Sequence, residues 1–176
     1  MKKSKIINIV FIVCILMVSY LYISTRLPYE PPEITIIIED KQIDYVVGKN
    51  QWNGAKYDRE DTFTTLMKVY SVNELPYIEI GSTAIIKFTK YPPDKVTITD
   101  IIIDDSGMLI YSDKANINIP VEIINKVITF EIKKYSASAL SSYYVEENIV
   151  LRGFRINATW GQNECEYAFI IKTDGL

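Results

Sequence analysis

Short segments in which apolar and polar residues alternate dominate the chain after residue 33. Successive side chains of a strand point to opposite faces, so this period of two favours β-strands with one buried face. The clearest case is the C-terminal pair of segments, Phe154–Trp160 and Cys165–Ile171, which are separated by Gly161-Gln162-Asn163. We expect these segments to form two paired strands joined by a turn.

The same alternation recurs at intervals of about ten residues, with Pro, Gly and Asp between the segments. The other expected strands lie within residues 34–39, 42–47, 77–80, 84–90, 96–103, 108–111, 117–124 and 126–134. We expect the first two to pair across Asp40-Lys41, the last two to pair with each other, and Asp104–Gly107 to form a hairpin turn. Nine or ten short strands predict a mainly β domain, an antiparallel Ig-like β-sandwich over residues 34–176.

One segment departs from the strand pattern. The run from Gln42 is expected to end at Gly48, and the polar stretch up to Asp61 holds the turn signal Trp52-Asn53-Gly54. Asp61 is suited to cap a helix, because its carboxylate can accept a hydrogen bond from a free backbone N–H. The apolar residues that follow have helical spacing and predict one short helix: Phe63, Leu66, Met67 and Tyr70.

The N-terminus carries a different signal. Lys2, Lys3 and Lys5 precede 18 mostly apolar residues, Ile6–Ile23, and an α-helix needs about 20 such residues to cross a bilayer. Because positive residues stay on the cytoplasmic side, we expect a single-pass membrane protein with its N-terminus inside. The predicted organisation is a cytoplasmic stub (1–5), a transmembrane helix acting as a signal-anchor (6–24), a Pro-rich spacer (25–33) and an extracytoplasmic domain (34–176).

Two other interpretations of this segment remain open. A cleaved signal peptide needs small side chains before its cleavage site, whereas Tyr20-Leu21-Tyr22-Ile23 is bulky. A lipoprotein signal would place lipid on Cys14, but Phe11-Ile12-Val13 precedes it and the apolar run continues beyond it. We therefore expect an uncleaved anchor in which Cys14 is a plain apolar residue.

Charge and composition exclude several functions. Four of the 19 basic residues precede Leu27 and all 22 acidic residues follow it, so residues 27–176 carry a net charge of −7. Nucleic-acid phosphates need clustered Lys and Arg, and no nucleic-acid partner is expected. The chain has no His, which excludes Ser-His-Asp and Cys-His catalysis and imidazole metal sites. Cys165 is the one cysteine after the anchor, so this domain can form no internal disulfide.

Two parts of the chain resemble small membrane-anchored proteins and lipoproteins of Gram-positive bacteria. The residues that carry the resemblance are Pro32-x-Ile34-x-Ile36, Gly48-x-x-x-Trp52, Ile156-x-Ala158-x-Trp160-Gly161 and Tyr167-Ala168-Phe169. The middle of the domain is not covered, and the chain departs from the lipoprotein members at Cys14. The resemblance implies a β-sandwich at the cell envelope and brings no activity with it.

Four aromatic residues are least explained by strand alternation: Trp52, Tyr57, Tyr143 and Tyr144. They fall in the two long loops expected at Lys49–Asp61 and Tyr135–Asn148. Aromatic residues on loops can anchor a protein partner or stack on sugars; the alternative is that they close the ends of the sandwich. We predict a non-enzymatic role, either recognition of a protein or glycan partner of the cell envelope or a structural part of an envelope complex.

Two further hypotheses rest on acidic residues. Asp58, Glu60 and Asp61, or the turn Asp104-Asp105, offer oxygen ligands for Ca²⁺ in an adhesion module, although neither matches a known calcium loop. Asp58 and Asp61 are also the candidate pair for an envelope hydrolase that uses two carboxylates. Solvated turns are the simpler explanation of both clusters, and we expect no cofactor, no metal and no catalytic residue. Cys165 shares its strand face with apolar neighbours and is expected to pack in the core.

Overall fold

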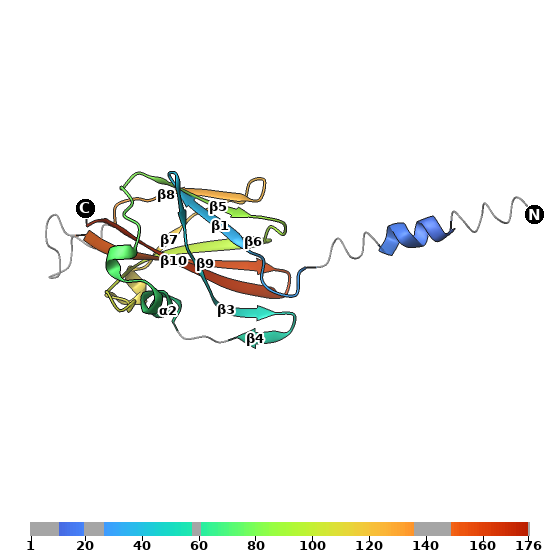
Figure 1. Cartoon of the computed structure of the whole chain (residues 1–176), viewed down its shortest axis with the longest axis horizontal. Helices are drawn as coiled ribbons and strands as arrows, with labels where there is room; N and C mark the ends of the chain where they lie inside the picture. The colour runs from blue at the N-terminus through green and yellow to red at the C-terminus, as the bar shows by residue number, and fades with distance from the viewer. Residues whose placement is uncertain (1–10, 20–26, 58–60, 136–148, 176) are drawn as a thin grey trace, which may run out of the picture.

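The computed structural model describes residues 11–19, 27–57, 61–135 and 149–175 of the chain. From residue 34 onward it is mainly β, with two antiparallel sheets whose arrangement fits a β-sandwich (Figure 1). The four-stranded sheet has the order β2-β1-β5-β8, and the six-stranded sheet has the order β4-β3-β10-β9-β6-β7.

The strands of the four-stranded sheet are β1 (Ile34–Ile38), β2 (Lys41–Ile43), β5 (Thr83–Phe88) and β8 (Val127–Glu131). Those of the six-stranded sheet are β3 (Val46–Trp52), β4 (Ala55–Tyr57), β6 (Lys95–Ile103), β7 (Ile117–Ile119), β9 (Ile149–Trp160) and β10 (Asn163–Asp174). Between the strands, the described residues form the α-helix α2 (Thr62–Val69) and two 3₁₀ turns, η1 (Val72–Glu74) and η2 (Asp113–Ala115).

The main hydrophobic core lies between the inner faces of the two sheets. In the four-stranded sheet Ile36 is paired with Ile86, which is paired with Ile128, and all three are fully buried. From the six-stranded sheet Phe154 and Phe169 stack with their ring centroids 4.8 Å apart. Burying each such side chain is worth about 1.5–3 kcal/mol, so alternation along paired strands accounts for this core.

A second, smaller core lies on the outer face of the six-stranded sheet, under α2. Phe63 of the helix is fully buried there, and three glycines make room for the first turn of the helix. A Cβ on Gly153 would lie 2.6–2.9 Å from the Phe63 ring, one on Gly107 would lie 2.7 Å from the Phe63 backbone, and one on Gly48 would lie 2.5 Å from Thr62. Glycine is therefore required at these positions because the helix approaches so closely.

Several expectations from the sequence are confirmed. β9 and β10 form the long C-terminal hairpin. The predicted helix is α2, and the Asp61 carboxylate caps it by accepting a hydrogen bond of 3.2 Å from the Phe63 N–H. Asn53 and Gly54, both with positive φ, form the tight turn between β3 and β4. Cys165 is buried in the main core.

Two predictions near the start of the domain are wrong. The strand does not end at Gly48 but continues through it to Trp52, because Gly48 marks the close approach of Thr62 and not a turn. The run from Gln42 to Val47 is not one strand either. Its first part belongs to β2 and its last part to β3, and these strands lie in different sheets.

The predicted pairing of residues 117–124 with 126–134 is wrong except for one bridge, between Ile124 and Val127. β7 pairs with β6 and β8 pairs with β5, so the two strands belong to different sheets. β7 ends at Ile119 because Pro120 follows and has no N–H for a ladder. The segment expected as a strand at 77–80 makes a single bridge, between Tyr77 and Lys172, and the return after Asp104–Gly107 is likewise one bridge, Ile103 with Leu109.

Near the N-terminus, residues 11–19 are helical and their side chains are exposed. Within the parts of the chain that the structure describes, no helix has both the length and the apolar character that a membrane crossing requires.

Candidate functional site

An aromatic groove of ≈ 530 Å³ lies between the segment that precedes β1 and the inner face of the β3–β4 hairpin. The hairpin is at one edge of the six-stranded sheet, where it extends away from the rest of the sandwich (Figure 1). The residues that line the aromatic groove are Tyr29, Glu30, Pro31, Glu33, Tyr45, Val47, Asn50, Trp52, Asn53, Ala55 and Tyr57. The spacer and the first hairpin of the larger sheet therefore form its two walls.

Hydrogen bonds from the domain hold the spacer wall in place. The Trp52 indole Nε1 donates to the Pro28 carbonyl at 3.0 Å, and Asn53 Nδ2 donates to the Tyr29 carbonyl at 3.2 Å. Beyond them, the buried Tyr167 hydroxyl donates to the Pro32 carbonyl at 2.6 Å. Prolines at 28, 31 and 32 restrict the backbone further. Residues 28–32 of the spacer are thus held against the domain.

Trp52 is one of the four predicted binding residues, but its ring is buried. Its exposed fraction is 2%, and it packs edge to face against Trp160 at 5.2 Å. Burial leaves almost none of the ring for a partner. Trp52 therefore closes the end of the sandwich, which was the alternative to partner binding in the sequence analysis. Its indole N–H positions the spacer.

Tyrosine rings provide the accessible surface of the aromatic groove. Tyr57, also among the predicted binding residues, is 52% exposed on β4, and Tyr29 is 88% exposed on the spacer. Tyr45 is half-buried; its ring packs edge to face on Tyr167 at 5.8 Å and its hydroxyl accepts a hydrogen bond from the Ile34 N–H. Such rings offer apolar area at little cost in conformational entropy, which suits a recognition surface.

The charged residues of the aromatic groove that the structure describes are acidic. They are Glu30 and Glu33, both exposed, and none of the described lining residues is Lys or Arg. Asn50 adds a further acceptor: its Nδ2 donates to the Gly48 carbonyl at 3.3 Å, whereas its Oδ1 is buried and accepts no hydrogen bond from any residue that the structure describes. A buried acceptor without a donor costs about 1–3 kcal/mol.

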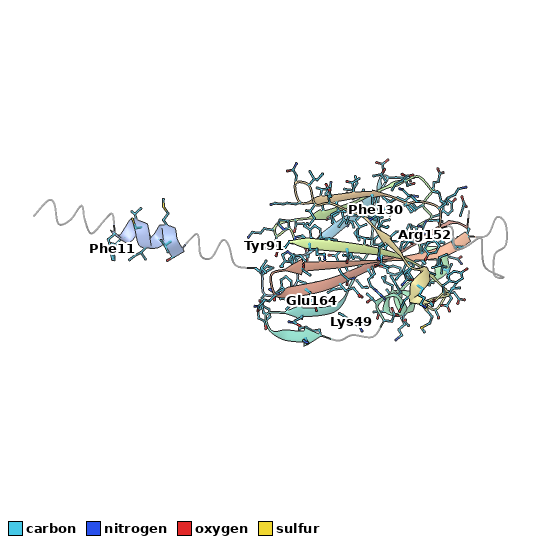
Figure 2. All side chains as sticks on the ribbon, turned by 180° about the vertical axis from the view of Figure 1, so that it is seen from behind. Phe11, Lys49, Tyr91, Phe130, Arg152 and Glu164 are labelled. Carbon is cyan, nitrogen blue, oxygen red and sulfur yellow. The ribbon has the colours of Figure 1, made fainter. Side chains whose placement is uncertain are left out.

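A second hollow, of ≈ 370 Å³, lies on the opposite face of the same hairpin. Lys49 and Lys56 line it together with Glu164 and Glu166, and Figure 2 labels Lys49 and Glu164 on this part of the sheet. Glu166 is already engaged, because it accepts a hydrogen bond from the Thr62 hydroxyl and pairs with Arg155. With both signs of charge and an internally paired carboxylate, this hollow shows no preference for one class of ligand.

A buried ion pair lies at the other end of the sandwich. Arg152 on β9 donates to both carboxylate oxygens of Asp100 on β6, and its Nη1 donates to the Lys133 carbonyl at 2.8 Å. Arg152 lies far along the domain from Tyr91, whose carbonyl accepts from Trp160 near the aromatic groove (Figure 2). Burial raises the pKa of Asp100, and Arg152 opposes that rise. Sequence alternation had not predicted this pair.

Two of the acidic residues proposed for calcium or hydrolysis, Asp61 and Asp104, have structural roles. Asp61 caps α2, and its Oδ1 lies 3.7 Å from Arg155 Nη2. Asp104 Oδ1 accepts from Ser106 and from the Met108 N–H, and these bonds lower the pKa of Asp104. Among the described residues, no three His, Cys, Asp or Glu side chains are grouped to hold a metal ion. Asp58 and Glu60 fall outside the described residues, so the calcium and hydrolase hypotheses stay predictions.

The remaining predicted residues divide in two. Tyr143 and Tyr144 lie outside the described residues, as does most of the loop expected at Tyr135–Asn148. Cys165 is 2% exposed, and burial raises the pKa of its thiol to about 12, so it is protonated and shielded at neutral pH.

Sequence reasoning missed Tyr29, Glu30, Glu33 and Asn50 as parts of one site. Tyr29 carried a usable signal, since an aromatic residue between prolines that is not part of a strand has no core to enter. Asn50 had none, because its position opposite the spacer depends on how the β3–β4 hairpin folds back.

Comparison with known proteins does not add an assignment: no family model matches the sequence, and no curated protein matches it.

Proposed function

We propose that this chain is a membrane-anchored recognition module. In this proposal residues 6–24 anchor it in the cell membrane, and an Ig-like β-sandwich outside the cytoplasm binds a protein or cell-envelope partner without catalysing a reaction. The observation that carries the proposal is the aromatic groove, in which exposed tyrosines from two separate segments border a hollow of ≈ 530 Å³.

The form of the aromatic groove supports binding. Its spacer wall is tied to the domain at Pro28, Tyr29 and Pro32, so it is organised before a partner arrives. A preformed site avoids part of the entropy cost of ordering on binding. Its rings belong to the residue types that are enriched among binding hot spots. The absence of His from the whole chain is consistent with a non-enzymatic role.

The location rests on the sequence. Lysines before the apolar run Ile6–Ile23 place the N-terminus inside, and a fixed spacer would hold the aromatic groove close to the outer surface of the membrane. The mass of the intact protein extracted from membranes tests the anchor. We expect a chain that includes the apolar run and carries no lipid, whereas a diacylated chain that begins at Cys14 would contradict it.

Crosslinking of the full-length protein in its native membrane, followed by mass spectrometry, tests the binding role. The variants are Tyr57→Ala and Tyr29→Ala, with Met108→Ala as the matched control. Met108 is 54% exposed, close to the 52% of Tyr57, and does not line the aromatic groove. Truncating an aromatic hot spot commonly costs more than about 1 kcal/mol, so we expect capture to fall by about fivefold or more with the tyrosine variants.

The pattern across variants decides the outcome. A captured species that is lost with Tyr57→Ala and Tyr29→Ala but kept with Met108→Ala supports the aromatic groove as the binding site. Capture that all three variants leave unchanged would refute it, as would equal losses in all three.

A further inference from the structure

We infer that the aromatic groove receives Lys or Arg side chains from a basic segment of a partner protein. This inference rests on the binding role proposed above and specifies the chemistry of the partner. It is drawn from the charges, the hydrogen-bond inventory and the rings of the aromatic groove.

The charges of the aromatic groove complement a cationic partner. Glu30 and Glu33 are exposed on the spacer wall, and none of the described lining residues is basic. The surrounding domain, residues 27–176, has a net charge of −7. A field of one sign attracts a partner of the opposite sign and repels acidic ones. A cationic segment is therefore favoured on approach as well as on contact.

The strongest hydrogen-bonding groups of the aromatic groove are acceptors. Trp52 Nε1 and Asn53 Nδ2 already donate to spacer carbonyls, and Asn50 Nδ2 donates to the Gly48 carbonyl. The carboxylates of Glu30 and Glu33 only accept, and the tyrosine hydroxyls of the lining can both donate and accept. Lys and Arg side chains carry three and five N–H donors and no acceptor, which is the complementary inventory.

Glycans are the other class of envelope ligand, and the carboxylates of Glu30 and Glu33 distinguish the two. A sugar hydroxyl can also donate to a carboxylate, but a neutral glycan carries no positive charge to pair with Glu30 and Glu33.

The tyrosine rings of the aromatic groove also suit a cation. Tyr29, Tyr45 and Tyr57 border the hollow with exposed or half-buried rings. The negative face of an aromatic ring attracts a cation, by about 0.5–1 kcal/mol at exposed sites. The same rings accommodate the apolar stems of Lys and Arg. Charge, hydrogen bonding and ring contacts thus favour one class of side chain.

The test is equilibrium binding to the full-length protein in a zwitterionic detergent. The probes are a synthetic peptide of alternating Lys and Gly, the same peptide with every Lys Nε-acetylated, and a chitin oligosaccharide. The variants are the double substitution Glu30→Gln with Glu33→Gln, the control double substitution Glu122→Gln with Glu131→Gln, and Tyr57→Ala. Glu122 and Glu131 are exposed and outside the aromatic groove, so the control changes the net charge equally.

We expect the Lys peptide to bind, and acetylation to weaken it by about tenfold because the charge and two donors are lost. Glu30→Gln with Glu33→Gln should weaken it by about fivefold, which is typical of losing two exposed ion pairs, while the control double variant stays within about twofold.

Three results would overturn the inference. It fails if the acetylated peptide binds as well as the Lys peptide, or if the control pair of substitutions weakens binding as much as the groove pair. It also fails if the chitin oligosaccharide binds in preference to the Lys peptide. If Tyr57→Ala abolishes partner capture in membranes while the glutamate substitutions change nothing, the cation inference fails and the binding role stands. If neither set of variants changes capture, both fail.

Discussion

Substitutions in the ion pair of Asp100 and Arg152 test whether these two charges stabilise each other inside the domain. Both side chains are nearly inaccessible to solvent, so replacing Arg152 by Met would leave a buried carboxylate without its cation. The change would also free the Lys133 carbonyl, which Arg152 Nη1 contacts at 2.8 Å, and remove a cation from the Phe154 ring. Breaking a buried pair in this way costs about 3–5 kcal/mol, whereas replacing both partners by apolar residues is often close to neutral.

We therefore expect Arg152→Met to lower the free energy of unfolding by about 3–5 kcal/mol and Asp100→Leu to have a similar effect. The double variant should lose less than either, with a coupling energy of at least about 2 kcal/mol. The assay is urea unfolding of the full chain in detergent. It is monitored by the fluorescence of Trp52 and Trp160, both of which lie in the core. The buried pair would be refuted if each single substitution lowered the free energy of unfolding by less than about 1 kcal/mol and the two losses added in the double variant.

The pH dependence gives the same experiment a second readout. Burial already raises the pKa of Asp100, and removing Arg152 removes the main opposing influence. In Arg152→Met the folded state therefore favours the protonated acid more than the unfolded state does. A raised folded pKa gives stability that is present at low pH and lost as the pH rises through it. The difference in unfolding free energy between the parent and Arg152→Met should thus become smaller as the pH falls toward 4. A difference that does not change with pH would contradict this account.

Three further predictions follow from local geometry. Gly153→Ala should lower the free energy of unfolding by about 1–3 kcal/mol, because the new Cβ would clash with the Phe63 ring. In a Phe63→Ala background, which removes the ring, Gly153→Ala should cost much less. Additive losses of the two substitutions in urea unfolding would contradict the contact. NMR titration should give Asp104 a pKa below the usual range of an Asp. Because this pKa is lowered in the folded state, the stability that Asp104 contributes should be present at neutral pH and lost as the pH falls through it. An Asp104→Ala variant with an unchanged acid unfolding transition would argue against this. In a Cys14→Ser background, Cys165 should resist thiol reagents at pH 8 and react after denaturation, because burial raises its pKa to about 12; rapid labelling of the native protein would show that Cys165 is accessible.

Local pattern predicted the parts of the fold that depend on neighbouring residues. The β9–β10 hairpin has twelve residues in each strand joined by a glycine turn, so alternation and turn chemistry agree. The helix α2 was predictable because Asp61 caps it and its apolar spacing is helical. Strand partners were not predictable where the chain crosses between sheets, as it does between β2 and β3 and between β7 and β8, because periodicity identifies a buried face but not the sheet that it joins.

The site was predicted in part for the same reason. Trp52 and Tyr57 stood out as aromatic residues near a turn, and both line the aromatic groove, one buried and one exposed. The spacer wall was missed because its contact with the hairpin joins residues 24 positions apart, Pro28 and Trp52. Asp100 and Arg152 lie on the apolar faces of their strands, and this position indicates a buried charge. That the two residues are partners follows only from the pairing of β6 with β9.

Photo-crosslinking from the aromatic groove tests the central claim most directly. A photoreactive phenylalanine analogue would replace Tyr57 in one variant of the full-length protein and Met108 in another, and both would be illuminated in the native membrane. The two positions have similar exposed fractions, 52% and 54%, so chance encounters should be equal. The account predicts a discrete crosslinked product from position 57 and none above background from position 108. Equal products from both positions, or a product from position 108 alone, would contradict it.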